Sequence, residues 1–397
     1  MTMKLTSAKI KNFKSLGEVD LTFRDLTIIV GSNSSGKSNS LEALRFFNLL
    51  VGADSFPPLE VMERYLRFNQ DSIDATLAVE EEGKYAEYRI FVTADKRKTT
   101  IANETLKVNG IDIIQILNGQ GVVSDEDGGN NQRYQSDPET LEGLALRSAG
   151  NFGNKPFTRK LASYIKNWEF YDVDPAIMRQ TCYLIERFKG ISERIKDGKK
   201  TPSLDADAGE VQEVLNYWAE NKKEKLEEIS KELHNCLNIS LISVGEEEKI
   251  VNVLEGDGKK IPLSSMSDGT LRLIAYLILL YQSDIPPLIC IEEPERNLHP
   301  GILKDVAAIM KRLSRRTQVV FTTHSSQLLD CFQSDEISSE ISVILLSKKD
   351  DSGTKSFLLD KLAEKRDDLL DWMNDFGLGS AIYHSHLIEE ILGTQNA

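Results

Sequence analysis

One short segment near the start of the chain carries the residue types that bind phosphate. Gly31-Ser-Asn-Ser-Ser-Gly-Lys-Ser38 fits the pattern G-x-x-x-x-G-K-[ST] at every position. Its glycines allow a tight turn whose backbone N–H groups point inward at an anion. In this pattern the lysine reaches the outer phosphates of a nucleotide and the last hydroxyl binds Mg²⁺. The segment predicts a nucleotide-binding loop made of Gly31, Ser32, Asn33, Ser34, Ser35, Gly36, Lys37, Ser38 and Asn39.

Two adjacent carboxylates end an apolar run late in the chain. Pro287-Leu-Ile-Cys-Ile leads directly into Glu292 and Glu293, followed by Pro294 and Glu295. Neighbouring side chains of a strand point opposite ways, so the two carboxylates can have different roles. We assign Glu292 to Mg²⁺, and Glu293 to orienting or deprotonating an attacking water. The alternative is a pair of charges in an ordinary turn.

Two further motifs fit phosphate chemistry. His324 directly follows the apolar run 318–323, and a neutral histidine there can hydrogen-bond a phosphate or a water. A second motif precedes the apolar helix predicted for 273–280, whose N-terminus favours an anion. Its residues are Ser267, Asp268, Gly269 and Thr270, with Ser267 or Asp268 as the helix N-cap. The alternatives are a structural histidine and an ordinary capped core helix.

These residues need elements that position them. The run Leu26–Val30 predicts a buried strand, and Lys37–Leu50 predicts a helix by its apolar spacing. Alternation predicts a hairpin over 72–93, and 124–131 is typical of a loop. Helices are expected at 139–149, 157–167, 176–196, 360–373 and 385–392, with one or two over 210–237, and strands at 240–244 and 249–254. After residue 238 the pattern alternates helix and strand, as a parallel sheet requires.

Bulk properties exclude several classes. The 397 residues carry a net charge of −14, which argues against a surface that is basic throughout. The four cysteines are scattered, as in reduced cytosolic proteins. The longest apolar stretch, 273–281, is too short to span a bilayer, and residues 1–15 show no signal peptide. We expect a cytoplasmic protein without a membrane partner.

Together, the motifs resemble the ABC-type ATPase heads of the RecF/SMC class. The resemblance rests on the phosphate loop, Ser-Asp-Gly-Thr at 267–270, Glu-Glu-Pro-Glu at 292–295 and Thr-Thr-His-Ser at 322–325, in this order. It is closer still to the stand-alone AAA ATPases of bacterial defence and toxin–antitoxin loci, which are relatives of the OLD-family ATPase half. Arg296-Asn-Leu-His-Pro300 is similar to the D-loop of that group, and 171–179 with 204–215 to its helical insert.

The resemblance implies an α/β fold with a β-rich N-terminal lobe and a RecA-like parallel sheet. The head would comprise residues 1–137 and 238–350, with a helical insertion at 138–237 and a short helical segment at 351–397. ATP and Mg²⁺ would be the cofactors, and Glu293 and His324 the catalytic residues. Two departures are Glu292, where such heads usually carry aspartate, and Asp268, where transporters carry glycine. The glutamine that such heads place at the metal has no secure position; Gln70 is the candidate.

In such heads ATP lies between two subunits, so residues 267–270 would act on ATP held by a second copy. The resemblance thus implies a homodimer or a higher even oligomer. It implies a switch that regulates a separate effector, a nuclease or a toxin, in bacterial defence. A RecF-like ATPase acting on DNA and a nucleotide-dependent scaffold with little turnover are the alternatives, which leaves nucleic acid open as a partner. Residues 348–397 are expected to be too short for the Toprim nuclease of OLD proteins.

Overall fold

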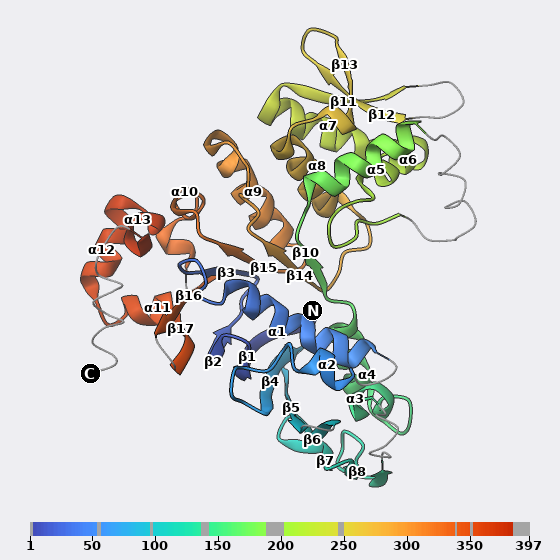
Figure 1. The fold of residues 1–397 in the computed structure, drawn as a ribbon, viewed down its shortest axis with the longest axis vertical. Coiled ribbons are helices and arrows are strands. Elements are labelled where there is room, and N and C mark those ends of the chain that lie inside the picture. The colour runs from blue at the N-terminus through green and yellow to red at the C-terminus, as the bar shows by residue number, and fades with distance from the viewer. Residues whose placement is uncertain are drawn as a thin grey trace.

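The computed structural model describes residues 3–53, 57–95, 98–135, 143–187, 202–244, 250–337, 340–349 and 352–383, and the structural statements below concern these. Within them, fourteen strands form one continuous sheet and three strands form a small separate one. In Figure 1 the large sheet runs along the molecule, with a helical region at one end and an antiparallel lobe at the other.

Parallel strands form the part of the large sheet that carries the predicted site. They lie in the order β10 (Glu169–Tyr171), β14 (Leu288–Glu292), β15 (Gln318–Thr323), β3 (Leu26–Val30) and β16 (Ile341–Lys349). The strands predicted from the apolar runs 26–30 and 318–323 are confirmed. Because the carboxyl ends of parallel strands share one edge, the segments after β3, β14 and β15 converge there.

Alternation along β3 divides the protein into two cores. Ile28 packs with the helices α8 (Asp268–Tyr281) and α9 (Leu303–Ser314) on one face of the sheet. Ile29 packs on the other face with α1 (Lys37–Gly52), α3 (Ala145–Ala149) and α4 (Pro156–Lys166). The helix predicted at 37–50 is confirmed and runs two residues further. Because alternate side chains of β3 point to opposite faces of the sheet, β3 lies between two layers of helices, which fix the start of the phosphate loop.

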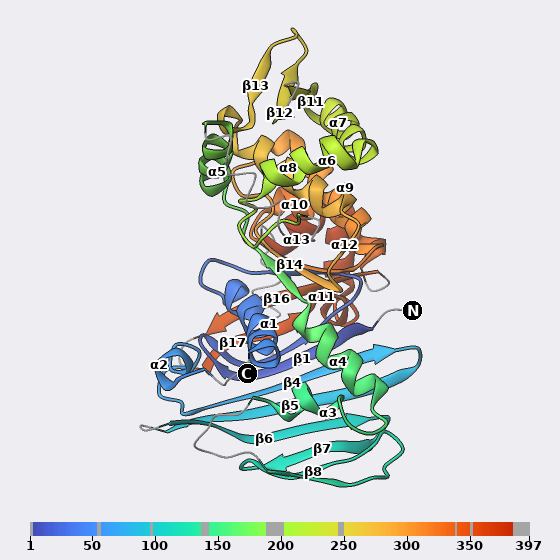
Figure 2. The ribbon, with the colours of Figure 1, turned by 90° about the vertical axis from the view of Figure 1, so that its right-hand side faces the viewer.

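Beyond β16 the sheet continues as an antiparallel lobe with one parallel pair, between β17 (Gly353–Leu358) and β2 (Leu16–Thr22) (Figure 2). The predicted hairpin is confirmed as β4 (Ser72–Glu81) and β5 (Lys84–Asp95). The region after residue 94, which the sequence pattern left unassigned, forms further strands, and 124–131 is the loop between the last two. In spatial order the lobe contains β17, β2, β1 (Lys4–Phe13), β4, β5, β6 (Lys98–Val108), β7 (Ile111–Leu117), β8 (Gln120–Val123) and β9 (Gln132–Gln135).

The helical region packs around α8. It contains α5 (Pro175–Arg187), α6 (Val211–Asn221), α7 (Lys223–Leu237) and the small sheet of β11 (Ile239–Val244), β12 (Ile250–Glu255) and β13 (Lys260–Pro262). The stretch 210–237 therefore forms two helices. The helix predicted at 139–149 begins only at Ala145 among the described residues, and the end of the one predicted at 176–196 lies outside them. The division of the chain into head and insertion stays a prediction, although β10 within 138–237 joins the large sheet.

The C-terminal segment forms short helices. Helix is confirmed around 360–373, where it forms two separate elements, α11 (Leu359–Ala363) and α12 (Asp367–Phe376). They are followed by α13 (Leu378–Tyr383), which the sequence pattern did not predict and which lies beside α10 (Ser326–Leu329) in Figure 1. The helix predicted at 385–392 lies outside the described residues. Of the helices in the described ranges, none combines the length and apolarity needed to cross a membrane.

Candidate active site

The phosphate loop joins β3 to α1 at the carboxyl edge of the sheet. Gly36 has φ +102° and caps α1, and a Cβ on it would lie 2.8 Å from Oγ1 of Thr354 and 2.9 Å from Oγ of Ser15. A Cβ on Gly31 would lie 2.4 Å from Oγ of Ser35. Both glycines are therefore required by the local packing as well as by the backbone conformation. At these two positions the loop backbone packs so closely on its neighbours that no side chain fits, and the glycines allow the tight turn that a backbone cradle for phosphate needs.

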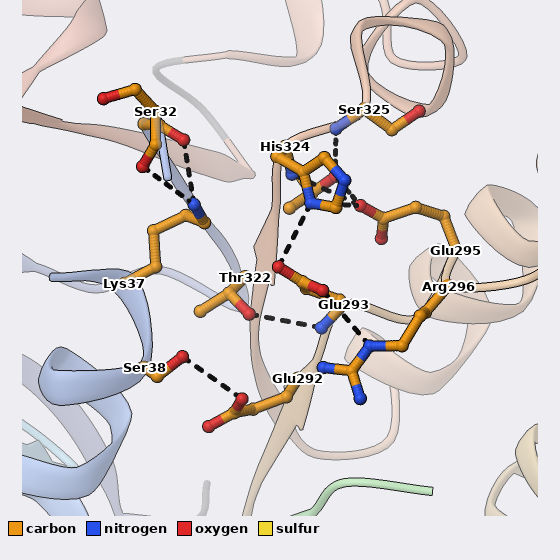
Figure 3. Close-up of polar contacts among 12 residues, drawn as sticks. Ser32, Lys37, Ser38, Glu292, Glu293, Glu295, Arg296, Thr322, His324 and Ser325 are labelled. Atoms are coloured by element: carbon orange, nitrogen blue, oxygen red, sulfur yellow. Dashed lines mark hydrogen bonds and ion pairs between the residues drawn. The ribbon is translucent and has the colours of Figure 1, made fainter. Parts of the chain in front are cut away.

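Lys37 is folded back into the loop. Its side chain is buried, and Nζ donates to the carbonyl oxygens of Gly31 at 2.9 Å and Ser32 at 3.1 Å (Figure 3). Burial lowers the pKa of Lys37, while three nearby carboxylates oppose the shift: Glu293, Glu295 and Glu292. An ammonium held only by backbone carbonyls can exchange them for phosphate oxygens, which bind it more strongly because they are charged.

Other loop residues differ in how they are engaged. Oγ of Ser35 is buried and has no hydrogen-bond partner among the described residues. Such an orphaned polar atom inside the loop fits a site for a polar ligand. Ser32, Asn33 and Ser34 are exposed, whereas Nδ2 of Asn39 donates to Oγ of Ser15 at 2.7 Å. Asn39 thus fastens the first turn of α1 to the β1–β2 connection.

Glu292 faces the start of α1. Its carboxylate accepts a hydrogen bond from Oγ of Ser38 at 3.2 Å. Burial raises the pKa of Glu292, and the nearby carboxylate of Asp172 raises it further. These three residues line one cavity of about 460 Å³ beside α1. A hydroxyl and two carboxylates are hard oxygen donors of the kind that Mg²⁺ prefers.

The donor set fits Mg²⁺ that keeps several waters. Within the ranges that the structure describes, no three His, Cys, Asp or Glu residues group closely enough to form an all-protein metal cage. Mg²⁺ in nucleotide sites is commonly bound through one or two carboxylates and substrate phosphates. Ser38, Glu292 and Asp172 are the residues that would hold it here.

Glu293 points away from Glu292. Its φ of +40° is unusual for a residue with a side chain, and its backbone N–H donates to the carbonyl of Thr322 at 3.1 Å. Oε1 lies 3.1 Å from Nδ1 of His324, and Oε2 accepts from Nε of Arg296 at 3.2 Å. Burial acts to raise the pKa of Glu293, but His324 and Arg296 outweigh it and the net pKa is lowered. Glu293 is therefore an ionised carboxylate, held between two cationic or hydrogen-bonding partners beside the phosphate loop.

Glu295 holds the backbone on which the histidine lies. One of its oxygens accepts from Oγ1 of Thr323 at 2.6 Å and from the backbone N–H of His324 at 3.3 Å. Burial raises the pKa of Glu295, and its second oxygen has no partner in the described part of the chain. The sequence pattern did not separate this carboxylate from the other two, because its burial depends on the packing of α8 and β15.

The motif at 267–270 lies at the start of α8. Ser267 is confirmed as the N-cap, since its Oγ accepts from the N–H of Thr270 at 3.2 Å. Asp268 pairs with Arg179 of α5 and accepts from Nδ2 of Asn297 at 3.4 Å. A Cβ on Gly269 would lie 3.1 Å from Leu298, so the motif packs directly on the segment after Glu295.

This motif and the phosphate loop do not meet within one chain. Over the described ranges, no hydrogen bond or ion pair joins residues 267–270 to residues 31–39. Figure 1 shows α8 in the helical region and the β3–α1 junction in the middle of the molecule. The structure thus brings together Lys37, Ser38, Glu292, Glu293 and His324, and leaves the residues at 267–270 apart from them.

Asp172, which the sequence pattern did not single out as a site residue, stands beside Glu292, whereas Gln70 does not. Gln70 is exposed in a turn before β4 and does not line the cavity that Ser38 and Glu292 share. Asp172 directly follows β10, whose Tyr171 pairs with Ile291, so it stands beside Glu292 at the edge of the sheet. It also accepts from Nη1 of Arg296 at 3.0 Å. In the sequence, Asp172 is marked only as an acid that directly follows the short apolar run 170–171. This signal is weak because β10 has only three residues.

Comparison with known proteins places this site in a family. Residues 26–330 match the family described as "AAA domain, putative AbiEii toxin, Type IV TA system". The chain is similar to the ATP/GTP phosphatase of Helicobacter pylori, with 25% identity over 82% of this chain and 86% of that protein. It is also similar to the Old nuclease of Escherichia phage P2, with 22% identity over 83% of this chain but only 58% of the nuclease.

A solved structure shares the fold. The SMC head bound to the C-winged helix domain of ScpA superposes with a TM-score of 0.50 and 18% identity, over 90% of this chain and 99% of that one. The expected P-loop head with a mixed sheet and flanking helices is therefore confirmed as the fold of this chain.

Proposed function

Since this chain belongs to the AAA domain family of putative AbiEii toxins of Type IV TA systems and has the fold of an ABC-type ATPase head, we propose that two copies of it form an ATP-hydrolysing switch. Each ATP would lie between the phosphate loop of one copy and residues 267–270 of the other. A twofold axis brings these unlike surfaces together twice. The closed dimer would form with ATP and open after hydrolysis.

The observation that carries this proposal is the separation of the two half-sites. Phosphate-binding and water-activating groups are assembled around the β3–α1 junction, whereas the exposed N-cap Ser267 starts a helix that points its N-terminus elsewhere. A helix N-terminus favours an anion, and over the described residues no hydrogen bond or ion pair joins the start of α8 to the phosphate loop of the same chain. A second copy would supply the missing phosphate group.

Each residue of the loop side has a role in this proposal. Lys37 leaves the carbonyls of the loop and binds the outer phosphates of ATP. Ser38, Glu292 and Asp172 would hold Mg²⁺, which would neutralise phosphate charge. Glu293 accepts a proton from the water that attacks the γ-phosphorus, as the bond to the ADP oxygen breaks. His324, held by Glu293 through Nδ1, keeps Nε2 for the γ-phosphate or the water.

A separately encoded effector, a nuclease or a toxin of a defence system, is the proposed partner. Support comes from the relatives, because this chain matches 58% of the phage Old nuclease, and the similar SMC head is bound to a domain of ScpA. The helices around α8 are the proposed route to the effector. Asp268 is tied to α5 through Arg179, so closure on ATP at residues 267–270 would move α5 as well.

Concentration dependence tests the proposal. Phosphate release with ATP and Mg²⁺ is measured over a range of protein concentrations that extends well below the dimer dissociation constant. We expect the rate per chain to rise with concentration and then to reach a plateau, because a second copy completes each site. A rate per chain that stays constant down to the lowest concentration, with a monomer on light scattering, would contradict the shared site. No phosphate release at any concentration would contradict the ATPase itself.

A further inference from the structure

The last described helix reaches the phosphate loop from the C-terminal end of the chain. The hydroxyl of Tyr383 in α13 lies 3.3 Å from the backbone nitrogen of Gly31, 3.4 Å from the carbonyl oxygen of Gly31 and 3.4 Å from the carbonyl oxygen of Thr323. Gly31 opens the phosphate loop, and Thr323 directly precedes His324. One phenol therefore bridges two segments of the candidate site that are about 290 positions apart in sequence.

α13 is fixed to the segment that carries the histidine. The backbone nitrogen of Gly379 donates to Oδ1 of Asp330 at 2.8 Å. A Cβ on Gly379 would lie 2.0 Å from the carbonyl oxygen of Ser326, so only glycine allows this close approach. Ser325, between His324 and α10, caps α10 by accepting from the N–H of Leu328. α13 thus contacts the segment from Thr323 to Asp330 at both of its ends.

A tyrosine hydroxyl has one proton, which limits what Tyr383 can do at once. It accepts from the N–H of Gly31 and donates to only one of the two carbonyls at a time. In the structure, Gly31 already accepts from Nζ of Lys37 at 2.9 Å, which is shorter than its contact with Tyr383. The carbonyl of the buried Gly31 loses this partner when Lys37 turns to a phosphate.

We infer that Tyr383 is a positioning residue of the ATP site. Its hydroxyl donates to the carbonyl of Thr323 while Lys37 serves the carbonyl of Gly31, and it takes over the carbonyl of Gly31 when Lys37 turns to the phosphates. The inference rests on the proposed ATPase function and deepens it. It makes α13 part of the nucleotide-binding machinery, because the N–H of Gly31, and its carbonyl once Lys37 has turned away, depend on the hydroxyl of Tyr383. Leaving a buried carbonyl without a donor is unfavourable, so the effect of Tyr383 is largest in the nucleotide-bound state.

The test compares Tyr383→Phe with the wild type and with Tyr85→Phe. The control removes a hydroxyl from a half-exposed tyrosine of β5, in the antiparallel lobe. For Tyr383→Phe we expect the Kd for ATP and the KM for hydrolysis to rise about tenfold. The thermal unfolding temperature should fall less without nucleotide than with saturating ATP. Without nucleotide, Lys37 still serves the carbonyl of Gly31, so at Gly31 only the N–H loses its partner. Tyr85→Phe should match the wild type in all three measurements.

A second variant tests the docking of α13. Gly379→Ala should weaken ATP binding to a similar extent, and combining it with Tyr383→Phe should add little, because both changes remove the same contact. Unchanged Kd and KM in Tyr383→Phe would overturn the inference, as would a lower unfolding temperature without nucleotide at unchanged Kd, which marks a purely structural role. These results are distinct from failure of the proposed function, in which the wild type itself binds no ATP.

Discussion

Oγ of Ser38 lies 3.2 Å from a carboxylate oxygen of Glu292, although 254 positions separate the two residues in the sequence. The contact joins the first turn of α1 to the carboxyl end of β14. In the sheet, β15 lies between β14 and β3, the strand that leads into the phosphate loop. It places a hydroxyl and a carboxylate where a cation bound to nucleotide phosphates would need them.

Replacing Lys37 should abolish tight nucleotide binding. In Lys37→Ala the point charge for the phosphates is lost, and we expect ATP affinity to fall by about 10- to 100-fold, the effect of one charge-assisted hydrogen bond or more. Isothermal titration with ATP and Mg²⁺ measures it. Lys231→Ala, on the exposed face of α7, is the matched control. Wild-type affinity in Lys37→Ala would remove the phosphate-loop assignment.

Glu293→Gln should bind ATP but hydrolyse it slowly. The amide keeps the size and some of the hydrogen bonds of the side chain but cannot accept a proton from water, so we expect turnover to fall by about 10²- to 10⁴-fold. The variant should accumulate as an ATP-bound dimer in size-exclusion chromatography with light scattering. If Glu292→Gln produces this trapped dimer and Glu293→Gln keeps full turnover, the roles of the two carboxylates are reversed.

Two inactive variants should restore activity when mixed. Lys37→Ala disables the phosphate loop of one chain, and Ser267→Arg disables the start of α8 in the other. A mixed dimer contains one site with both surfaces intact, so partial phosphate release should return on mixing. Nucleotide-dependent dimerisation of the mixture is measured in parallel. Absence of rescue from a mixture that does form dimers with ATP would argue for sites that work only in pairs, and absence of dimers would contradict the shared site.

Asp172→Asn should make the site less able to bind Mg²⁺. Asp172 lines the same cavity as Ser38 and Glu292, and groups beside a metal site typically change its affinity by 10-fold or more. We expect the Mg²⁺ concentration for half-maximal hydrolysis to rise about tenfold, with a smaller change at saturating Mg²⁺. Gln70→Ala is the companion variant and should behave as the wild type. The opposite result for the two variants would return the metal-side role to Gln70.

A buried carboxylate in the antiparallel lobe predicts a pH dependence of stability. Glu104 is buried and accepts from the N–H groups of Ala145 and Leu146 and from the hydroxyl of Tyr88. Burial raises the pKa of Glu104 above its usual 4.5 in spite of these bonds. As the pH rises past 4.5, the unfolded chain therefore releases this proton before the folded protein does.

The contribution of Glu104 to the free energy of unfolding must therefore fall as the pH increases, until the pH exceeds the raised pKa of Glu104 in the folded protein. We expect the stability of the wild type relative to Glu104→Gln to decrease between about pH 4.5 and 7 in urea unfolding. The glutamine variant cannot titrate at this position and is therefore the reference for the wild type. A difference that stays constant over this range would show that Glu104 has the same pKa in both states.

Local sequence was sufficient for the elements that carry contiguous motifs. The loop at 31–38, its strand and its helix lie within about 25 residues, so spacing and apolar periodicity predicted them. The same holds for the strand ending at Glu292 and for the N-cap Ser267, since a cap depends on residues three positions apart. The C-terminal helices were predicted less well, because short helices have weak periodicity and depend on tertiary contacts.

The sequence by itself determined the motifs whose residue types suit phosphate binding and water activation, and the order in which they occur. Only the tertiary structure decided that Asp172, rather than Gln70, stands beside Glu292, and that Tyr383 touches Gly31. The parallel pairing of β10 with β14 and the docking of α13 on α10 create these neighbours. The resulting neighbours, Asp172 with Glu292 and Tyr383 with Gly31, are more than 100 positions apart in sequence. They depend on strand order and on close packing at single glycines. Neither leaves a periodic signal in the segments concerned, and for that reason the pattern of residues could not predict them.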